Sequence, residues 1–165
     1  MAYRQAALIE RGVGSAGRMA SMLADGPMTD YETLRAVDAA LASTTAVELD
    51  RVVIYDASVN GGELPAACEN GGSVAGTCNV YTASQVTTQS PVGFPRGSLQ
   101  DPVCVGGSWD EAWCPMTRDR ERPNPDRVGV HIEARYQSIT HMLPGSEVDI
   151  SHSASYLLEP PRIGD

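Results

Sequence analysis

The residues best suited to chemistry are four cysteines, Cys68, Cys78, Cys104 and Cys114, which form two pairs with nine residues inside each. That spacing is too wide for the Cys-x-x-Cys half-sites of a structural zinc ion, and no histidine neighbours either pair. Local disulfides, Cys68–Cys78 and Cys104–Cys114, are the simplest of three possible connectivities, with buried thiols as the alternative. Disulfides would place the protein outside the cytoplasm.

Three histidines, His131, His141 and His152, are the next candidates for a base or a metal ligand. His131 lies on the polar face of one predicted strand, and His152 lies on the more apolar face of the next. We therefore expect these two side chains on opposite sides of a sheet, with His141 in the turn between the strands. Because no third ligand of matching geometry accompanies them, the sequence predicts no metal or cofactor.

Two further patterns match known sites only in part. Gly12–Gly17 fits the G-x-G-x-x-G pattern of dinucleotide sites, but the residues before it predict a helix where that motif needs a strand. Asp119, Asn124 and Asp126 could offer oxygens to calcium without the usual spacing, so we expect a solvated charged loop at 118–127. No nucleophile elbow, zinc-protease motif or phosphate loop is present, which predicts a protein that is not an enzyme.

Composition restricts the possible partners. The chain has 165 residues and a formal net charge of −9, and all twelve of its basic residues are arginine. This charge argues against binding to nucleic acid or to an anionic membrane surface. No segment approaches the roughly 20 apolar residues that cross a bilayer, and no secretory signal is recognisable. The length fits a single domain over residues 1–165.

Residues 3–24 lack proline and place apolar or small residues at helical spacing, which predicts a long first helix. Within it Gly12, Ala16, Ala20 and Ala24 recur every four residues and form a smooth ridge. Small side chains at this spacing allow another backbone to approach closely. Two interpretations remain open: the ridge packs on the domain's own sheet, or it is an assembly surface for a neighbouring helix.

A second helix is predicted at 29–44, beginning at a capping box formed by Thr29 and Glu32. Residues 50–57 are rich in β-branched side chains and apolar on both faces, which is typical of a central strand. Residues 128–158 contain two alternating runs separated by Pro144 and Gly145, which predicts a hairpin that pairs with this strand. The predicted fold is therefore α+β, with both helices packed on a small antiparallel sheet.

Between these elements, residues 58–127 have little periodicity and contain both cysteine pairs. We interpret them as an ordered surface excursion closed by disulfides, in which residues 79–82 and 85–88 form short strands or ordered turns. Trp109 and Trp113 lie beside the second cysteine pair and are the candidate recognition residues of the excursion.

The order of these elements resembles the TadE/TadG-like proteins, the pseudopilins of the tight-adherence (Flp-type) pilus machinery. The resemblance extends over nearly the whole chain and is carried by short motifs: Gly17–Ser21, Asp30–Leu41, Asp50–Ala57, Pro65–Cys68, Cys78–Thr82 and the closing hairpin from Arg127 to Glu159.

The resemblance implies a pilin-like fold and a non-enzymatic role in pilus assembly, with other pilin-like subunits or assembly platform proteins as partners. It also implies an extracytoplasmic domain anchored to the cytoplasmic membrane or cell surface. Residues 1–165 contain no membrane helix, no prepilin-peptidase site and no acidic residue near a mature N-terminus, so no functional residue of the family can be transferred. We expect the anchor to precede residue 1 in the full-length protein. A secreted module that binds a glycan or surface partner through Trp109 and Trp113 is the alternative.

Overall fold

A four-stranded antiparallel sheet forms the centre of the fold, and the computed structural model describes residues 2–42, 44, 47–88, 90–98, 101–121, 123–137 and 147–160. Its strand order is β2-β1-β5-β6. The strands are Val47–Asp56 (β1), Cys78–Thr82 (β2), Arg127–Gln137 (β5) and Glu147–Leu157 (β6). The remaining elements are the helices Ala2–Leu23 (α1), Thr29–Leu41 (α2), Ala66–Glu69 (α3) and Ala83–Thr88 (α4), the 3-10 turns Asn60–Gly62 (η1), Pro91–Gly93 (η2) and Pro115–Thr117 (η3), and the two-stranded sheet of Arg96–Ser98 (β3) and Asp101–Cys104 (β4).

The predicted hairpin is confirmed. β5 and β6 pair without a register shift from Arg127 opposite Leu157 to Gln137 opposite Glu147. The central strand is also confirmed, since β1 pairs with β5 on one side and with β2 on the other. Residues 79–82 lie in the strand β2 as predicted, whereas residues 85–88 belong to the helix α4, so the strand or turn predicted there is wrong. The predicted turn at Pro144 lies outside the described residues, as do Gly145 and His141.

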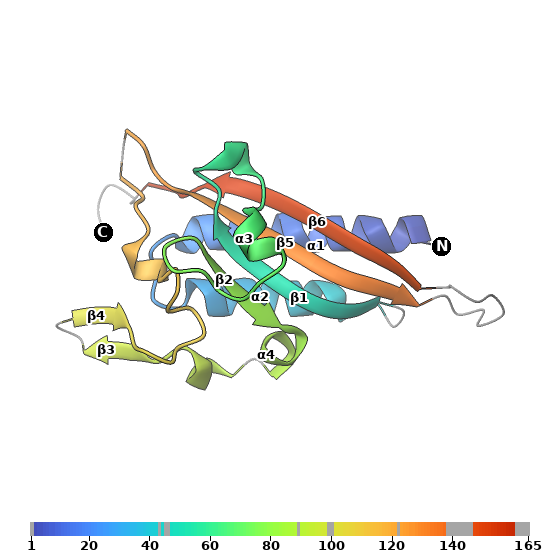
Figure 1. Ribbon diagram of the computed structural model, residues 1–165, viewed down its shortest axis with the longest axis horizontal. Coiled ribbons are helices and arrows are strands. Elements are labelled where there is room, and N and C mark those ends of the chain that lie inside the picture. Colours follow the sequence, from blue (N-terminus) through green and yellow to red (C-terminus); the bar gives the residue numbers. More distant parts are fainter. Residues whose placement is uncertain are drawn as a thin grey trace.

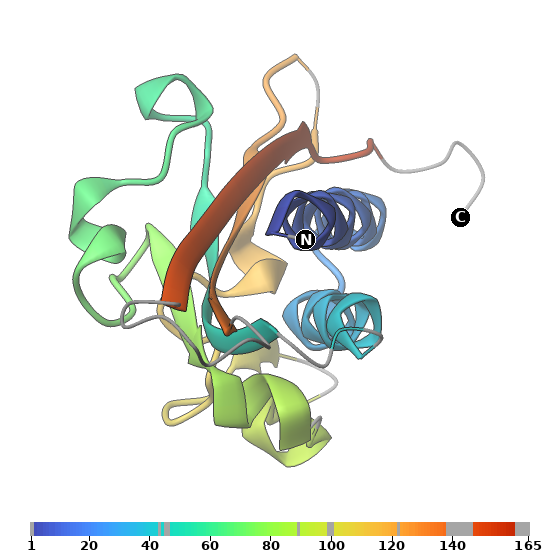
Figure 2. The same ribbon diagram turned by 90° about the vertical axis from the view of Figure 1, so that its right-hand side faces the viewer.

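The two long helices cover one face of this sheet, and the first part of the excursion, which contains η1 and α3, lies on the other (Figures 1 and 2). The later part of the excursion, from α4 to η3, packs beside α2 and adds Val86, Phe94 and Trp113 to the core on the helical side. Fully buried side chains of the sheet, among them Val52, Val130 and Ile132, pack against Ile9 and Val13 of α1 in the main core. Alternation along a strand turns successive side chains to opposite faces, so the remaining apolar residues of β1 form a second core. That smaller core contains Val53, Tyr55, Ala57, Cys68 and Cys78.

The first helix ends one residue before Ala24, which adopts a left-handed conformation with φ 49°. Its N–H donates to the carbonyl of Ala20, and the N–H of Gly26 donates to the carbonyl of Leu23, so the last turn is closed by backbone bonds. The helix, predicted over residues 3–24, therefore ends one residue earlier than predicted.

The start of α2 differs from the prediction. The N-cap residue is Met28, and no side chain caps it. Thr29 lies inside the helix, where its hydroxyl donates to the carbonyl of Gly26 at 2.8 Å, so the predicted capping box is wrong. Glu32 instead pairs with Arg35 one turn later. The helix ends at Leu41, earlier than predicted, and the N–H of Thr44 donates to the Leu41 carbonyl.

Both predicted disulfides are present, Cys68–Cys78 and Cys104–Cys114. The first lies in the smaller core and joins α3 to β2. The second joins the end of β4 to the residue before η3. No helix in the described part of the chain combines the length and apolar character needed to cross a membrane.

Candidate functional site

The small-residue ridge of α1 packs inside the domain. Ala16, Ala20 and Ala24 have no exposed surface, and Gly12 is also buried. The three alanines belong to the main core, and a Cβ at Gly12 would lie 3.1 Å from the Cβ of Ala40 in α2. The ridge is therefore no assembly surface, and the interpretation as close packing within the domain is confirmed.

The solvent-facing side of α1 contains a different stripe, Arg11, Ser15, Arg18 and Met22, flanked by the exposed residues Glu10, Met19 and Leu23. All four are exposed, Met22 by 57% of its surface. Their spacing of four, three and four residues places them on one side of the helix, opposite the residues that contact the sheet. We call these four residues the outer stripe of α1.

Trp109 and Trp113 both pack against other side chains of the domain, Trp113 as a buried residue and Trp109 as a partly exposed one. The Trp109 ring meets Phe94 edge-on with 5.4 Å between ring centroids, and a Cβ on Gly93 would overlap it. Trp113 is 6% exposed, and the Arg118 guanidinium lies 4.0 Å from its ring centroid. Of the two candidate recognition residues, Trp113 is therefore withdrawn into the core, and only Trp109 keeps surface that a partner could contact.

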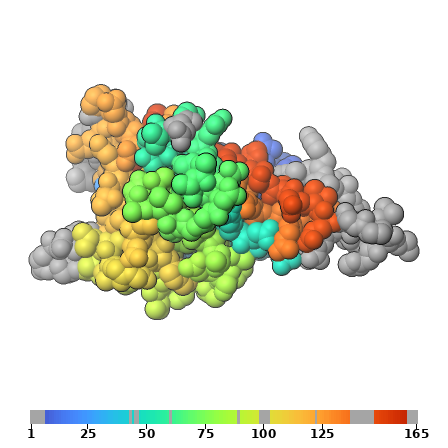
Figure 3. Space-filling view, in the orientation of Figure 1, coloured from blue at the N-terminus to red at the C-terminus, as the bar shows by residue number. Residues whose placement is uncertain are grey.

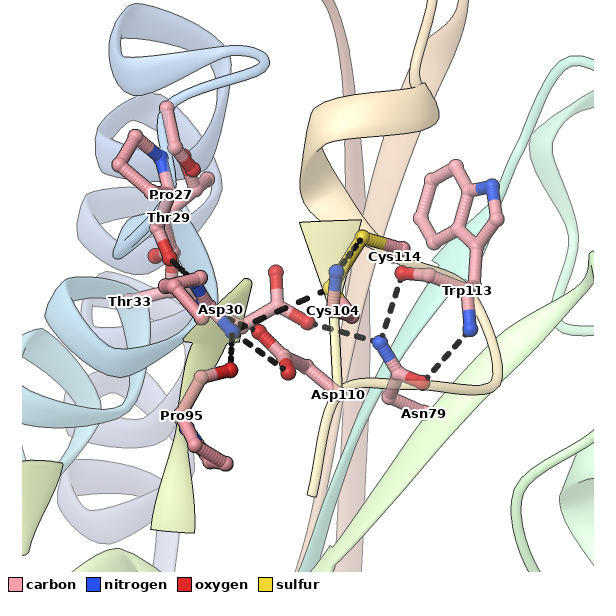
Figure 4. A network of polar contacts seen from close by, with 12 residues as sticks. Pro27, Thr29, Asp30, Thr33, Asn79, Pro95, Cys104, Asp110, Trp113 and Cys114 are labelled. Atoms are coloured by element: carbon pink, nitrogen blue, oxygen red, sulfur yellow. Dashed lines mark hydrogen bonds and ion pairs between the residues drawn. A yellow bond between two sulfur atoms is a disulfide. The ribbon is translucent and has the colours of Figure 1, made fainter. Parts of the chain in front are cut away.

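A buried polar network joins α2, β2 and the segment around η3 (Figure 4). Asp30 accepts hydrogen bonds from the Asn79 amide at 2.9 Å and from the Tyr81 hydroxyl at 2.7 Å. Asn79 also exchanges two hydrogen bonds of 2.9 Å with the backbone of Trp113. The buried polar groups of α2, β2 and the backbone at Trp113 are thus hydrogen-bonded to one another, as buried polar groups generally are.

Arg118 provides the positive charge of this network. Its Nη1 atom lies 2.7 Å from Oδ1 of Asp30, and neither side chain is exposed. Burial and the Asp30 carboxylate raise the pKa of Tyr81 well above its ordinary value, so this hydroxyl stays protonated and donates. The prediction that residues 118–127 form a solvated loop is wrong at Arg118.

Arg96 of the small sheet forms a second ion pair, with Asp110, and also bonds to the turn between α1 and α2. Asp110 is fully buried and lies 2.7 Å from Nη2 of Arg96, whose Nε also donates to the carbonyl of Pro27. Burial raises the pKa of Asp110, and the hydrogen bond from Arg96 opposes that rise. Both networks connect segments that are distant in the sequence, which indicates a structural role.

The excursion covers only part of the opposite face of the sheet, and β6 remains exposed beside it (Figure 3). On this face Nδ1 of His131 lies 2.7 Å from Oγ of Ser153, and Nε2 lies 3.1 Å from Oε1 of Glu133. Arg51 holds Glu133 through contacts of 2.6 and 2.7 Å. The four side chains form one continuous polar chain across β1, β5 and β6.

Burial dominates the electrostatics of this chain at His131. It lowers the pKa of the imidazole, and the hydrogen bond with Glu133 acts in the opposite direction. The hydrogen bond from Arg51 lowers the pKa of Glu133. His152 lies opposite Ile132, whereas His131 lies opposite Ser153, so the predicted placement of the two histidines on opposite faces is confirmed.

Sequence reasoning did not identify Ser153 as the partner of His131. The alternation of the two runs does place His131 and the serines of β6 on one face. Choosing among Ser151, Ser153 and Ser155 needs the hairpin register, and the turn residues alone do not determine it. The pairing of Asp30 with Arg118 was not predicted, because no pattern in the sequence indicates that these two distant segments lie in contact.

The proposed calcium ligands take part in a turn. Asp126 accepts from the backbone N–H of Asp119 at 2.7 Å, and Asp119 accepts from that of Glu121 at 2.7 Å. Within the described residues no group of three or more His, Cys, Asp or Glu side chains could hold a metal ion.

Comparison of the chain with protein-family models, curated proteins and solved structures found no match.

Proposed function

We propose that the chain is a pilin-like subunit, of the pseudopilin type, in a tight-adherence pilus or a related secretion apparatus. It acts through protein–protein contact with other pilin-like subunits or with assembly platform proteins. The family resemblance of its short motifs supports this proposal. A long first helix packed on an antiparallel sheet that closes in a hairpin is consistent with it.

The observation that carries the proposal is the outer stripe of α1. The helix buries one side against the sheet and α2 and leaves Arg11, Ser15, Arg18 and Met22 exposed along the other. The chain has a net charge of −9, so the two arginines on this stripe would complement an acidic surface on a neighbouring subunit of similar composition. Met22 adds an adaptable apolar contact.

The two disulfides support an extracytoplasmic location for the domain, since such bonds persist in oxidising compartments. In this proposal the full-length protein is anchored to the cytoplasmic membrane or cell surface by a helix that precedes residue 1, and α1 continues that anchor.

The proposal is tested by reversing the charge of the outer stripe in the organism that encodes the chain. Arg11→Glu combined with Arg18→Glu should abolish surface pili and co-isolation with the apparatus, while the unfolding midpoint of the purified domain stays unchanged. Arg35→Glu is the matched control, because Arg35 is an exposed helical arginine on α2. Normal pili in the double variant would refute the role of the stripe.

A further inference from the structure

We propose that Ser153, His131 and Glu133 form a nucleophilic site on the exposed face of the sheet, which reacts with small activated carboxylate esters. Ser153 is the nucleophile, His131 its general base, and Glu133 a positioning residue. This activity is separate from the assembly function proposed above and does not depend on it.

The hydrogen bonds indicate which ring nitrogen of His131 carries the proton. An ionised carboxylate only accepts, so the contact of 3.1 Å between Glu133 and Nε2 places the imidazole proton on Nε2. Nδ1 then carries the lone pair and faces the Ser153 hydroxyl at 2.7 Å. The Tyr55 hydroxyl, which donates to the carbonyl of Gly62, is a second side-chain partner of Ser153. A serine is activated as a nucleophile when its hydroxyl is hydrogen-bonded to a base and a third group orients that base.

The sheet sets this geometry. His131 and Ser153 lie directly opposite each other in the β5–β6 register. Beyond the strand ends, the N–H of Leu158 donates to the carbonyl of Asp126, which continues the same register. Even-numbered residues of β6 therefore bond to β5, and odd-numbered ones, including Ser153, form the non-hydrogen-bonded pairs whose side chains lie closer together.

The same alternation directs the backbone N–H of Ser153 away from β5, toward the outer edge of the sheet. The hydroxyl of Ser21 donates to the carbonyl of Leu157. The backbone groups of this odd-numbered residue of β6 therefore point away from β5, as expected for Ser153. Because β6 is the edge strand of the sheet, no further strand of the described part of the chain pairs with the Ser153 N–H. This N–H is placed to donate to the oxyanion that develops on a carbonyl attacked by the hydroxyl of the same residue.

Glu133 orients His131, and Arg51 in turn orients Glu133. Arg51 contacts both carboxylate oxygens of Glu133 and also donates to the backbone carbonyl of Glu69, so the carboxylate is fixed in place. Burial of His131, which is 8% exposed, favours the neutral imidazole that a general base requires. Ser153 itself is exposed and accessible to a reagent.

The neighbouring serines show that this arrangement is specific to one position. Ser151 lies opposite Glu133 and Ser155 lies opposite Gly129, so neither faces an imidazole. The Ser155 hydroxyl instead accepts from Arg127. All three serines are on the same face of the same strand, which makes Ser151 and Ser155 internal controls.

The reaction is an acyl transfer to water. Oγ of Ser153 bonds to the acyl carbon while its proton passes to Nδ1 of His131, and the alcohol or phenol leaves with that proton. Water then attacks the acyl-serine, returns a proton through His131 to Oγ, and releases the carboxylic acid. Ester and water give acid and alcohol, with no other reactant. Because Ser153 lies on an open strand, short acyl groups with good leaving groups are the substrate class.

The test treats the oxidised chain with a fluorophosphonate probe and with p-nitrophenyl acetate, and locates the adducts by peptide mass spectrometry. We expect an adduct at Ser153 and none at Ser151 or Ser155. Ser153→Ala should abolish labelling, Ser151→Ala should preserve it, and His131→Gln should slow it at least about tenfold. No adduct in the wild-type chain, or equal adducts at the three serines, would overturn the proposal.

The positioning role of Glu133 has its own readout. The charged groups that act on His131 are Glu133, Arg51 and Glu69, and Glu133 raises the pKa of His131 against the effect of burial. Glu133→Gln should therefore slow labelling of Ser153 and move the pH of its half-maximal rate downward. An unchanged pH profile would show that Glu133 does not act through the imidazole.

Discussion

Asp30 and Arg118 form an ion pair at 2.7 Å in which neither side chain is accessible to solvent. Asp30 lies in the first turn of α2, and Arg118 directly follows η3, so the pair fastens the excursion to the helical layer. Asn79 and Tyr81 bind the same carboxylate from β2. One carboxylate thus holds three segments together at the interior of the protein.

Removing one partner of this pair should be strongly destabilising. Arg118→Ala leaves a buried carboxylate without its counter-charge, which costs about 3–5 kcal/mol in the free energy of unfolding. Urea denaturation measures the loss. Arg120→Ala is the control, because Arg120 and Asp25 form a half-exposed pair at 3.2 Å, and its loss costs no more than about 1 kcal/mol. Equal effects of the two variants would contradict the structural role of Arg118.

The two disulfides should contribute unequally to stability. Both close loops of the same length, which the chain-entropy model values at about 2–3 kcal/mol each. Cys68 and Cys78 are fully buried, whereas Cys104 is only partly buried. Replacing the first pair with alanine also leaves a void in the smaller core, so it should lower the free energy of unfolding more than replacing the second pair. Equal losses would show that loop closure alone accounts for both.

Much of the fold could be predicted because it follows from periodicity within short segments. Alternation at 128–158 predicted the hairpin, and the apolar centre of 50–57 predicted the central strand. Equal cysteine spacing gave both disulfides. In each case the signal lies within one segment or in a simple spacing.

The polar interior could not be predicted, because it depends on contacts between distant segments. Arg118 sits in a run of charged residues and prolines that looks solvated, and only the path of the excursion brings it to Asp30. The pairing of His131 with Ser153 required a strand register. The ridge of α1 allowed two interpretations, packing within the domain or contact with a neighbouring helix. The sequence could not distinguish them, whereas the structure shows that the sheet and α2 cover the ridge.

Enlarging the ridge should destabilise the domain itself. Ala16 has no exposed surface and lies in the main core, so Ala16→Leu forces an overpacked contact that costs about 1–3 kcal/mol. Gly17→Ala should act similarly, because its Cβ would lie 2.4 Å from the Tyr156 ring. Ser15→Leu is the matched control on the outer stripe and should change stability by no more than about 0.5 kcal/mol. Thermal or urea unfolding distinguishes these outcomes, and an unaffected Ala16→Leu variant would place the ridge outside the core.

Stability should fall as the pH drops below neutrality, because of His131. Burial lowers the pKa of this imidazole in the folded chain, so the unfolded chain binds the proton at a higher pH, near the ordinary value of 6.5. The unfolded state therefore gains protons first as the pH falls, and the free energy of unfolding decreases from about pH 7 down to the folded pKa, by at most about 1.4 kcal/mol per pH unit. Asp110 changes the free energy of unfolding in the opposite direction at more acidic pH. Its pKa is raised, so the folded chain binds that proton before the unfolded chain does as the pH falls. Urea titrations of the wild type and His131→Gln between about pH 7.5 and pH 5.5 measure the difference in slope. Identical slopes would show that protonation of His131 is not linked to unfolding.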